Sequence, residues 1–288
     1  MLFIYLSVLL AAALHAYWNF LAKTIPSGAP FVWLVALCST VVLLPVVVWY
    51  VIAYGLPTDA KSLVFLAGSA VTHLVYFLIL QQGYQKADLS VVYPLARGTG
   101  PLFSTVGAVI FLSEKLTGLG ILGLALVLVG IILIVGFTNQ SWRNKRNQMG
   151  IRYGLVIGGL IASYTVWDGY AVKVLALSPI LVEYFSHPFR VMALTKNTVR
   201  QWPEVRFIWK KYWLKILAIS TLGPLGFILV LYAMQTAPVH FVAPARELSI
   251  VFGVLLGGRL LAEEHYKTRL VGALLMLVGI VMIAWQHG

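Results

Sequence analysis

Six charged side chains lie within long apolar stretches of this sequence. Three are cations and three are anions: Arg97, Arg190, Arg246, Asp168, Glu183 and Glu247. In the middle of a bilayer such a charge costs about 2.5 kcal/mol or more, so intramembrane charges usually have both partners and a function. One interpretation is structural, with internal ion pairs such as Arg97 with Glu247. The other is that these groups bind a solute or a proton.

Arg97 and Arg246 are the candidates for binding an anion. A guanidinium group presents a planar fork of N–H donors that suits a carboxylate or a phosphoryl group. Aromatic rings would form the walls of such a site and stack on apolar or cationic parts of a solute. The predicted binding residues are Arg97, Arg246, Trp18, Trp167, Tyr93, Asn19, Asp168, Tyr76 and Tyr232. The alternative for the Trp and Tyr residues is the aromatic belt at the membrane surface.

Proton coupling needs a group whose charge changes between two compartments. A carboxylate moved into a low-dielectric site binds a proton more readily, so it could take one up on one side and release it on the other. The sequence offers Glu247, Asp168, Glu183, His187 and His240 for this role. Hydrogen-bonded packing is the alternative for each histidine.

Metal and cofactor chemistry have little support in the sequence. Glu183 and His187 are four residues apart and could ligate a metal, but no third ligand stands out. Cys38 is the only cysteine, which excludes an internal disulfide or a thiolate cluster. No phosphate-binding P-loop is present, and the formal charge of +12 comes without a nucleic-acid-binding motif. We expect no enzyme, no metal, no cofactor and no nucleic-acid partner.

Helical spacing places several polar residues on shared faces. His15 and Asn19 are four residues apart, as are Tyr164 and Asp168, so each pair lies on one side of a helix. Two further stripes are formed by Tyr93, Arg97, Gly100 and Ser104, and by Glu183, His187 and Arg190. Such stripes cannot face lipid, so we expect them to meet at an interior cavity.

The elements that position these residues are membrane-spanning helices. Hydrophobic residues make up 60% of the chain and charged residues 10%, whereas a soluble domain has roughly 25% charged residues. Mean hydropathy is +0.90. Apolar runs recur along the whole chain. They predict an all-α polytopic membrane protein with about ten helices, at 2–22, 31–54, 62–83, 89–112, 118–137, 151–172, 178–195, 213–235, 239–260 and 268–285.

Basic residues are distributed unequally between the two sets of alternating links. The links after the first, third, fifth, seventh and ninth helices carry 15 Lys or Arg residues, and the other links carry 3. The positive-inside rule then places the basic links in the cytoplasm and both chain termini outside the cell membrane.

An internal repeat divides the chain into residues 1–140 and 150–288. An offset of 149 residues superimposes Trp18 on Trp167, Asn19 on Asp168, Arg97 on Arg246, Glu114 on Glu263, Gly123 on Gly272 and Gly130 on Gly279. Each half has five predicted spans, an odd number, so the second half must enter the bilayer in the opposite sense. Inverted repeats of this kind are typical of alternating-access transporters, with a solute site near the midplane.

Prolines and glycines also recur between the halves. Pro94 and Pro244 lie next to the repeated arginines and are predicted hinges, because proline frees a helical carbonyl group. Gly123 with Gly130, and Gly272 with Gly279, are seven residues apart and suit close helix packing. That packing could occur within a monomer or in a homodimer.

The sequence resembles the EamA-type family of the drug/metabolite transporter superfamily over nearly its whole length. The matching stretches are Tyr17 to Asn19 with Lys23, Val92 to Arg97, Phe111 to Leu116, the Gly123 and Gly130 helix, Ala243 to Glu247 and Leu261 to Glu263. The resemblance implies a ten-helix bundle that moves small metabolites, amino acids or drugs, often in exchange for protons. Such proteins usually have cytoplasmic termini, which is the reverse of the orientation that the charge count predicts.

The leading hypothesis is a secondary active transporter in the inner membrane, with a small solute and membrane lipid as its partners. It would move an amino acid or a related amphipathic or anionic solute, as a proton-coupled exporter or exchanger. A passive channel or a flippase for lipid-linked carriers is the alternative, and a membrane-embedded enzyme is a weaker one.

Overall fold

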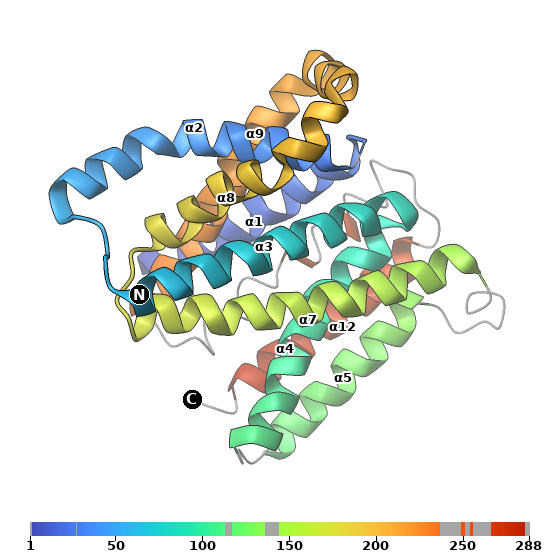
Figure 1. Cartoon of the computed structure of the whole chain (residues 1–288). Coiled ribbons are helices and arrows are strands. Elements are labelled where there is room, and N and C mark those ends of the chain that lie inside the picture. The colour runs from blue at the N-terminus through green and yellow to red at the C-terminus, as the bar shows by residue number, and fades with distance from the viewer. Residues whose placement is uncertain are drawn as a thin grey trace.

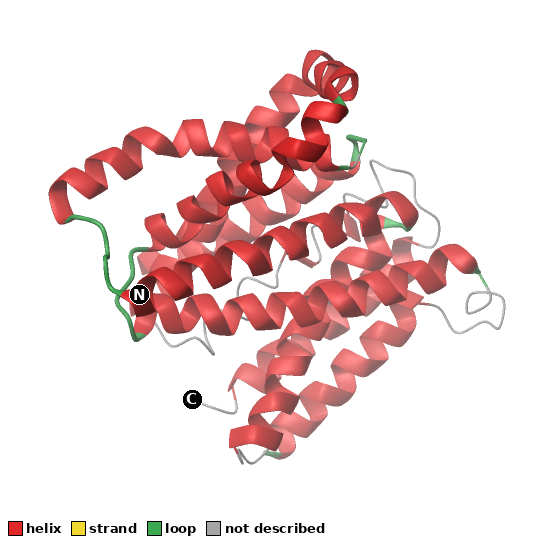
Figure 2. Ribbon diagram, in the orientation of Figure 1, coloured by secondary structure: helices red, strands yellow, loops and turns green. Residues whose placement is uncertain are grey.

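The computed structural model describes residues 2–26, 28–112, 117–135, 144–236, 249–250, 254–255 and 266–285. Within these ranges the chain forms nine helices and no strand (Figures 1 and 2). Their bounds are α1 Leu2–Lys23, α2 Ala29–Tyr54, α3 Ala60–Lys86, α4 Leu89–Leu112, α5 Gly118–Val135, α7 Lys145–Lys173, α8 Pro179–Arg200, α9 Trp202–Thr236 and α12 Tyr266–Trp285.

The largest difference from the predicted elements is at α9. We expected a polar link over 196–211 and a helix from 213, but α8 continues to Arg200 and α9 begins at Trp202. Pro203 and Glu204 stand in the first turn of α9, where a missing N–H is tolerated and a negative charge is favourable. The predicted helix 239–260 lies outside the described residues, apart from residues 249–250 and 254–255.

Several helix starts carry recognisable local signals. The Asp59 side chain caps α3 by accepting a hydrogen bond from the Ser62 backbone N–H at 2.9 Å. Asn144 caps α7 in the same way, through the Arg146 backbone N–H at 2.9 Å. Proline occupies the first turn of α2 and of α8, a position that suits its fixed φ angle.

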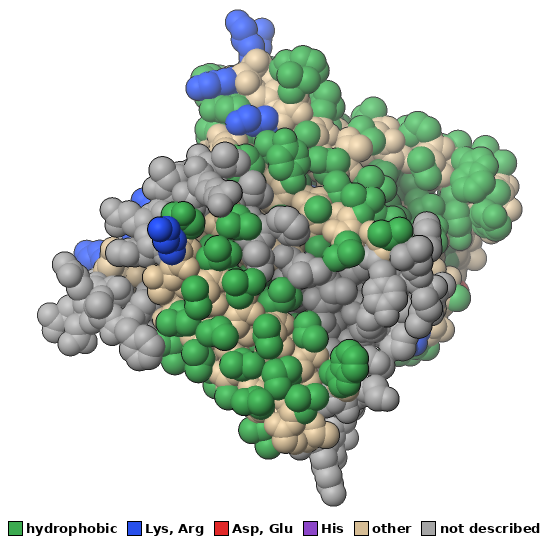
Figure 3. Space-filling model, turned by 180° about the vertical axis from the view of Figure 1, so that it is seen from behind, with side chains coloured by type: hydrophobic (Ala, Val, Ile, Leu, Met, Phe, Trp, Pro, Cys, Tyr) green, Lys and Arg blue, Asp and Glu red, His purple; other side chains and the backbone are tan. Residues whose placement is uncertain are grey.

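Five of the described helices are long and apolar enough to cross a membrane. They are α2, α3, α7, α9 and α12, and α5 is a shorter apolar helix. Large hydrophobic side chains also point outward, with Ile52 at 81% exposed and Val166 at 66%. Figure 3 shows apolar side chains over much of one face, with most of the visible Lys and Arg side chains toward its top and left edges. This surface identifies lipid as the solvent of a multi-pass membrane protein.

Helices from the two halves pack against each other throughout the bundle. Helix α1 packs on α9, α3 on α7, and α2 on α8, while α4 packs on α7 and α5 on α12. In Figure 1, α4, α5 and α12 form the lower part of the molecule, below α7. The two halves therefore pack together into one helical bundle.

Glycines permit the closest of these contacts. A Cβ atom added at Gly123 would lie 2.6 Å from the Gly279 carbonyl oxygen, and one added at Gly272 would lie 2.7 Å from the Gly130 carbonyl oxygen. These four glycines therefore pack α5 directly on α12 within one chain. Because residue 123 meets 279 and residue 130 meets 272, the two helices run antiparallel.

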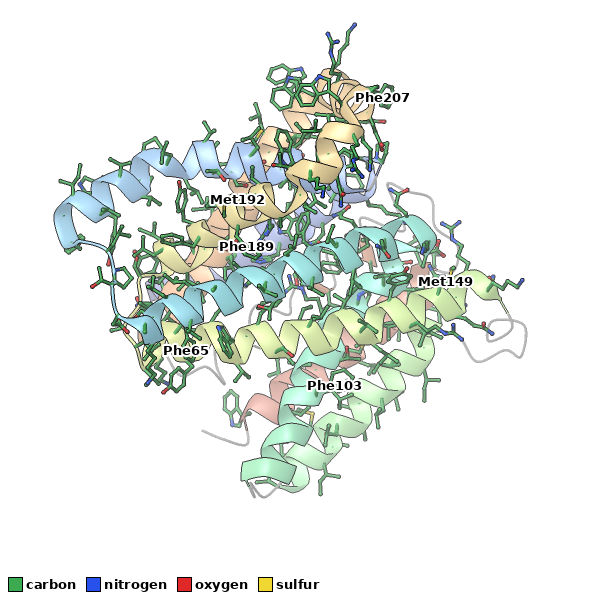
Figure 4. The ribbon with its side chains drawn as sticks, viewed as in Figure 1. Phe65, Phe103, Met149, Phe189, Met192 and Phe207 are labelled. Carbon is green, nitrogen blue, oxygen red and sulfur yellow. The ribbon has the colours of Figure 1, made fainter. Side chains whose placement is uncertain are left out.

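Polar contacts join helix ends at one end of the bundle, which we call the basic end. Lys23 donates to the Ala87 carbonyl at 2.5 Å, and Lys215 donates to the Thr24 hydroxyl at 2.8 Å. Asp88 binds Arg146 at 2.8 Å and Arg269 at 3.3 Å. Figure 4 shows Phe207 of α9 and Met149 of α7 toward this end, and Phe65 of α3 at the opposite end.

The opposite end of the bundle carries fewer basic side chains. Lys61, at the start of α3, donates to the Tyr170 hydroxyl near the end of α7 at 3.4 Å. Helices α3 and α7 therefore have opposite directions, since Lys86 at the end of α3 binds the Tyr153 hydroxyl near the start of α7 at 2.9 Å.

Candidate solute-binding cavity

A central cavity with an empty volume of about 510 Å³ lies between helices of both halves. Seven helices contribute to its wall, namely α1, α2, α3, α4, α7, α8 and α9. Its polar lining residues are His15, Trp18, Ser39, His73, Tyr76, Arg97, Tyr164, Glu183, His187 and Arg190.

Helix α8 supplies three of the charged or titratable groups of the central cavity. Glu183, His187 and Arg190 share one face because they are separated by four and three residues. Glu183 Oε1 and His187 Nε2 are 3.0 Å apart, and the Arg190 guanidinium donates to the Ser186 hydroxyl at 2.9 Å. The Arg190 Nε and His187 Nδ1 atoms are buried and make no hydrogen bond with the residues that the structure describes.

Arg97 brings a second guanidinium group to the cavity from α4. Its side chain is 2% exposed, and its Cζ atom lies 5.7 Å from the centre of the Tyr93 ring. The described lining thus contains two arginines and one carboxylate, Glu183. Each guanidinium group presents N–H donors that suit a carboxylate or a phosphoryl group of a solute.

Aromatic rings form the apolar part of the wall. Trp18 stacks on Phe77 with ring centres 5.7 Å apart, and Phe77 also lies 5.5 Å from the Arg190 Cζ atom. Tyr164 meets Tyr76 edge-on at 5.2 Å and Phe227 at 6.0 Å. These rings offer a flat apolar solute stacking surfaces beside the charged groups.

A histidine and a carboxylate pair across the two halves at the edge of the cavity. His73 Nε2 of α3 lies 2.8 Å from Asp168 Oδ2 of α7, and both residues are buried. Asp168 is grouped with Thr165 of α7 and with Phe227 and Met234 of α9.

Comparison with known proteins identifies the family of this chain. The sequence profile of the EamA-like transporter family matches residues 2–136 and 149–285. The chain belongs to this family. EamA-like proteins are transporters rather than enzymes, so the cavity is best considered as a passage for a solute.

Two further comparisons found similar proteins. The "Uncharacterized protein MJ1333.1" of Methanocaldococcus jannaschii is 30% identical over 129 residues, which are 44% of this chain and 91% of that protein. A solved crystal structure superposes with a TM-score of 0.59 at 13% identity, covering 98% of this chain and 99% of the other. This second likeness concerns the fold alone.

The structure places some of the predicted site residues of this EamA-like chain on the cavity and others away from it. Arg97, Trp18, Tyr76, Glu183 and His187 line the central cavity. Trp167 instead packs on α3, donating to the Phe65 carbonyl at 2.8 Å, and Tyr232 is 42% exposed. Asn19 and Tyr93 are buried outside the cavity lining; Asn19 accepts a hydrogen bond from the Tyr84 hydroxyl at 2.5 Å.

Four predicted residues lie outside the described part of the chain, namely Arg246, Glu247, His240 and Pro244. Pro94, the repeat partner of Pro244, lies in α4, and the helix continues through it. The suggested pair of Arg97 with Glu247 therefore stays a prediction.

Sequence reasoning missed His73, Phe77 and Phe227. An available signal was the repeat itself, because Phe77 and Phe227 are related by the same offset of 150 residues as Gln85 and Gln235. His73 has Gly223 as its counterpart at this offset, so the repeat gave no polar match for it. It stands out as a polar side chain within the apolar stretch of α3.

Proposed function

We propose that this EamA-like protein is a secondary transporter that carries a small metabolite with an anionic group, such as an amino acid, through the central cavity by alternating access. The observation that carries this proposal is the cavity lining, where Arg97 and Arg190 from different halves accompany a single described carboxylate. A transporter of this kind needs a solute site that both halves share.

Unused hydrogen-bonding atoms support an amphoteric solute such as an amino acid. The Arg190 Nε and Trp18 Nε1 atoms are buried donors without a hydrogen-bond partner in the described part of the chain, and a buried donor without a partner costs free energy. A carboxylate of the solute would be a suitable acceptor for such a donor. If His187 is neutral and its Nε2–H donates to Glu183, its Nδ1 is an acceptor and would receive an N–H of the solute.

Contacts at the basic end support two inverted repeats, 1–140 and 150–288. Lys23 near the end of α1 and Arg146 near the start of α7 both belong to this end. Helices α1 and α7 are repeat partners, so they would cross the membrane in opposite directions. Helices α3 and α9 are also repeat partners, and Lys86 of α3 and Lys215 of α9 both lie at the basic end. These two helices would therefore also cross the membrane in opposite directions. We propose ten spans, with 239–260 as the ninth.

The same contacts support one cellular orientation. All five basic links would lie on one side, and the positive-inside rule makes that side the cytoplasm of the inner membrane. Both termini would then face outward, contrary to the usual orientation of the family. Proton coupling belongs to the proposal as well, because an ion gradient must supply the energy where the sequence has no nucleotide-binding motif. Net export is part of the proposal and is measured by the direction of proton-driven flux.

Flux measurements in proteoliposomes test the transport proposal. The probes are radiolabelled phenylalanine, phenylacetate and phenyl phosphate, which share a ring and differ in their charged groups. We expect saturable uptake of at least one probe. Arg190→Gln or Arg97→Gln should lower uptake by about tenfold or more, because a lost charge-assisted hydrogen bond is worth about 1.5 to 3 kcal/mol.

Lys61→Gln provides the matched control, because it removes a cation at the opposite end of the bundle, outside the cavity. It should leave uptake unchanged. Flux that rises linearly with concentration would indicate a channel. Full uptake by both arginine variants would contradict the proposed site.

A further inference from the structure

The His73–Asp168 pair joins the two halves of the chain. His73 lies on α3 and Asp168 on α7, which pack along each other. The Glu183–His187 pair, by contrast, lies within the single helix α8. A contact within one helix is unaffected when helices move past each other, whereas a contact between α3 and α7 changes with their relative position.

The pair lies at the wall of the central cavity. His73 lines the cavity, whereas Asp168 is not among its lining residues. The His73 side chain is 9% exposed and the Asp168 side chain 0%. A proton would therefore reach Asp168 from the solute site through His73.

Asp168 is poorly compensated for a buried carboxylate. Its Oδ2 atom meets His73, but among the described residues its Oδ1 atom has no hydrogen-bond partner, and neither has the nearby Thr165 hydroxyl. An ionised carboxylate in an apolar site needs several hydrogen bonds or a close cation. A proton shared between the imidazole and the carboxylate supplies that compensation.

Other titratable groups surround the pair. Tyr164 of α7 lies 4.4 Å from the His73 ring and Tyr76 of α3 lies 6.5 Å from it, between ring centres. Across the cavity stand His15 of α1, Arg97 of α4, and Glu183, His187 and Arg190 of α8. Helix α9 contributes Phe227, which is not titratable, at 5.0 Å. An anionic solute bound near the two arginines would therefore change the electrostatic potential at His73.

We propose that the His73–Asp168 pair holds the coupling proton of this transporter. The inference rests on the proposed function. One proton binds the pair from one compartment and leaves to the other, and only an N–H or O–H bond forms and breaks. Proton occupancy is linked to the contact between α3 and α7, and through it to the access state of the cavity.

Proton binding is tested first, without any solute. Full-length protein in lipid nanodiscs is examined by infrared difference spectroscopy between neutral and acidic pH. We expect a buried carboxyl signal that is lost in Asp168→Asn and shifted in His73→Gln. The control Asp59→Asn removes a carboxylate outside the spans and should retain the signal. Loss of the carboxyl signal in Glu183→Gln, together with its retention in Asp168→Asn, would overturn the proposal.

Accumulation of whichever of phenylalanine, phenylacetate or phenyl phosphate is transported gives the second readout. A gradient of one pH unit can drive at most about tenfold accumulation per proton. We expect accumulation by the original chain and about none by Asp168→Asn, with solute exchange reduced much less. Equal loss of both would overturn the coupling role. Absence of all flux in the original chain would instead contradict the proposed function, while the infrared result would still stand.

Discussion

Asp59 is a residue whose role can be separated from transport. It caps α3 from the link after α2, and hydrogen bonds from the Ser62 side chain and backbone hold the pKa of its carboxyl below the usual value. A lowered pKa in the folded state means that the ionised form is the stabilising one.

The pH dependence of stability follows from that direction. The contribution of Asp59 is complete above the pKa of an unfolded aspartate and disappears as the pH falls through the lowered folded value. We therefore predict that Asp59→Ala lowers the melting temperature at neutral pH and has less effect in acid. Thermal unfolding in detergent at several pH values measures this. An equal loss at every pH would mean that the charge is unimportant.

Side-chain environments explain which site residues the sequence could predict. Glu183, His187 and Arg190 were found because helical spacing alone places them on one face. Trp18 and Trp167 are repeat partners, yet only Trp18 lines the cavity. Trp167 has the Phe65 backbone carbonyl as a partner on α3. A repeat predicts equivalent backbone positions, but the neighbouring side chains decide where each ring points.

Between helices, regularly spaced glycines permit the closest packing. Gly150, Gly154 and Gly158 recur every four residues on α7 and meet Val91, Leu95 and Thr99 on α4. The four-residue spacing was visible in the sequence as a small-residue motif, although its partner helix was not. The distances show that α4 is the partner.

Neighbouring glycines of α7 allow a matched test of this packing. A Cβ atom at Gly158 would lie 3.0 Å from the Thr99 Cβ and 3.1 Å from the Ala96 carbonyl oxygen, whereas one at Gly159 meets nothing within 4 Å. We predict that Gly158→Ala destabilises the protein by about 1 to 3 kcal/mol, as overpacking does.

Gly159→Ala should be neutral or stabilising by up to about 1 kcal/mol, because alanine favours helices over glycine. Chemical unfolding of both variants in the same detergent gives the comparison. Equal stabilities would show that the contact between α4 and α7 tolerates an added methyl group.

Helix α9 is longer than the apolar span that hydropathy alone locates. At about 1.5 Å per residue, its 35 residues extend roughly 50 Å, longer than a hydrocarbon core of about 30 Å. Apolar composition located the span near 213–235, but helix propensity and a favourable first turn extend it through a basic stretch. The residue at which a helix begins therefore need not lie at the membrane boundary.

For the whole molecule, orientation is the property that most needs a measurement. Lys210 and Lys61 are exposed residues near opposite ends of the bundle. In a background where Cys38 is replaced by serine, we predict that Lys61→Cys reacts with an impermeant thiol reagent from outside intact cells. Lys210→Cys should react only after permeabilisation. The reverse pattern would place both termini in the cytoplasm.

Much of the architecture followed from periodicity, and the rest depended on contacts between distant segments. The apolar runs predicted the helices that are described, and the family resemblance is confirmed by the profile match. The pairing of His73 with Asp168 could not be predicted, because the two residues are 95 positions apart and lack a shared repeat position.

The two walls made by α2 and α8 differ in a way that bears on how a solute lies. Helix α2 contributes Val35 and Ser39 to the lining, whereas α8 contributes Glu183, His187 and Arg190. Two identical walls would hold a solute equally well in either of two poses related by a half-turn. One uncharged and one charged wall would remove that degeneracy, so that the charged end of a solute would face α8.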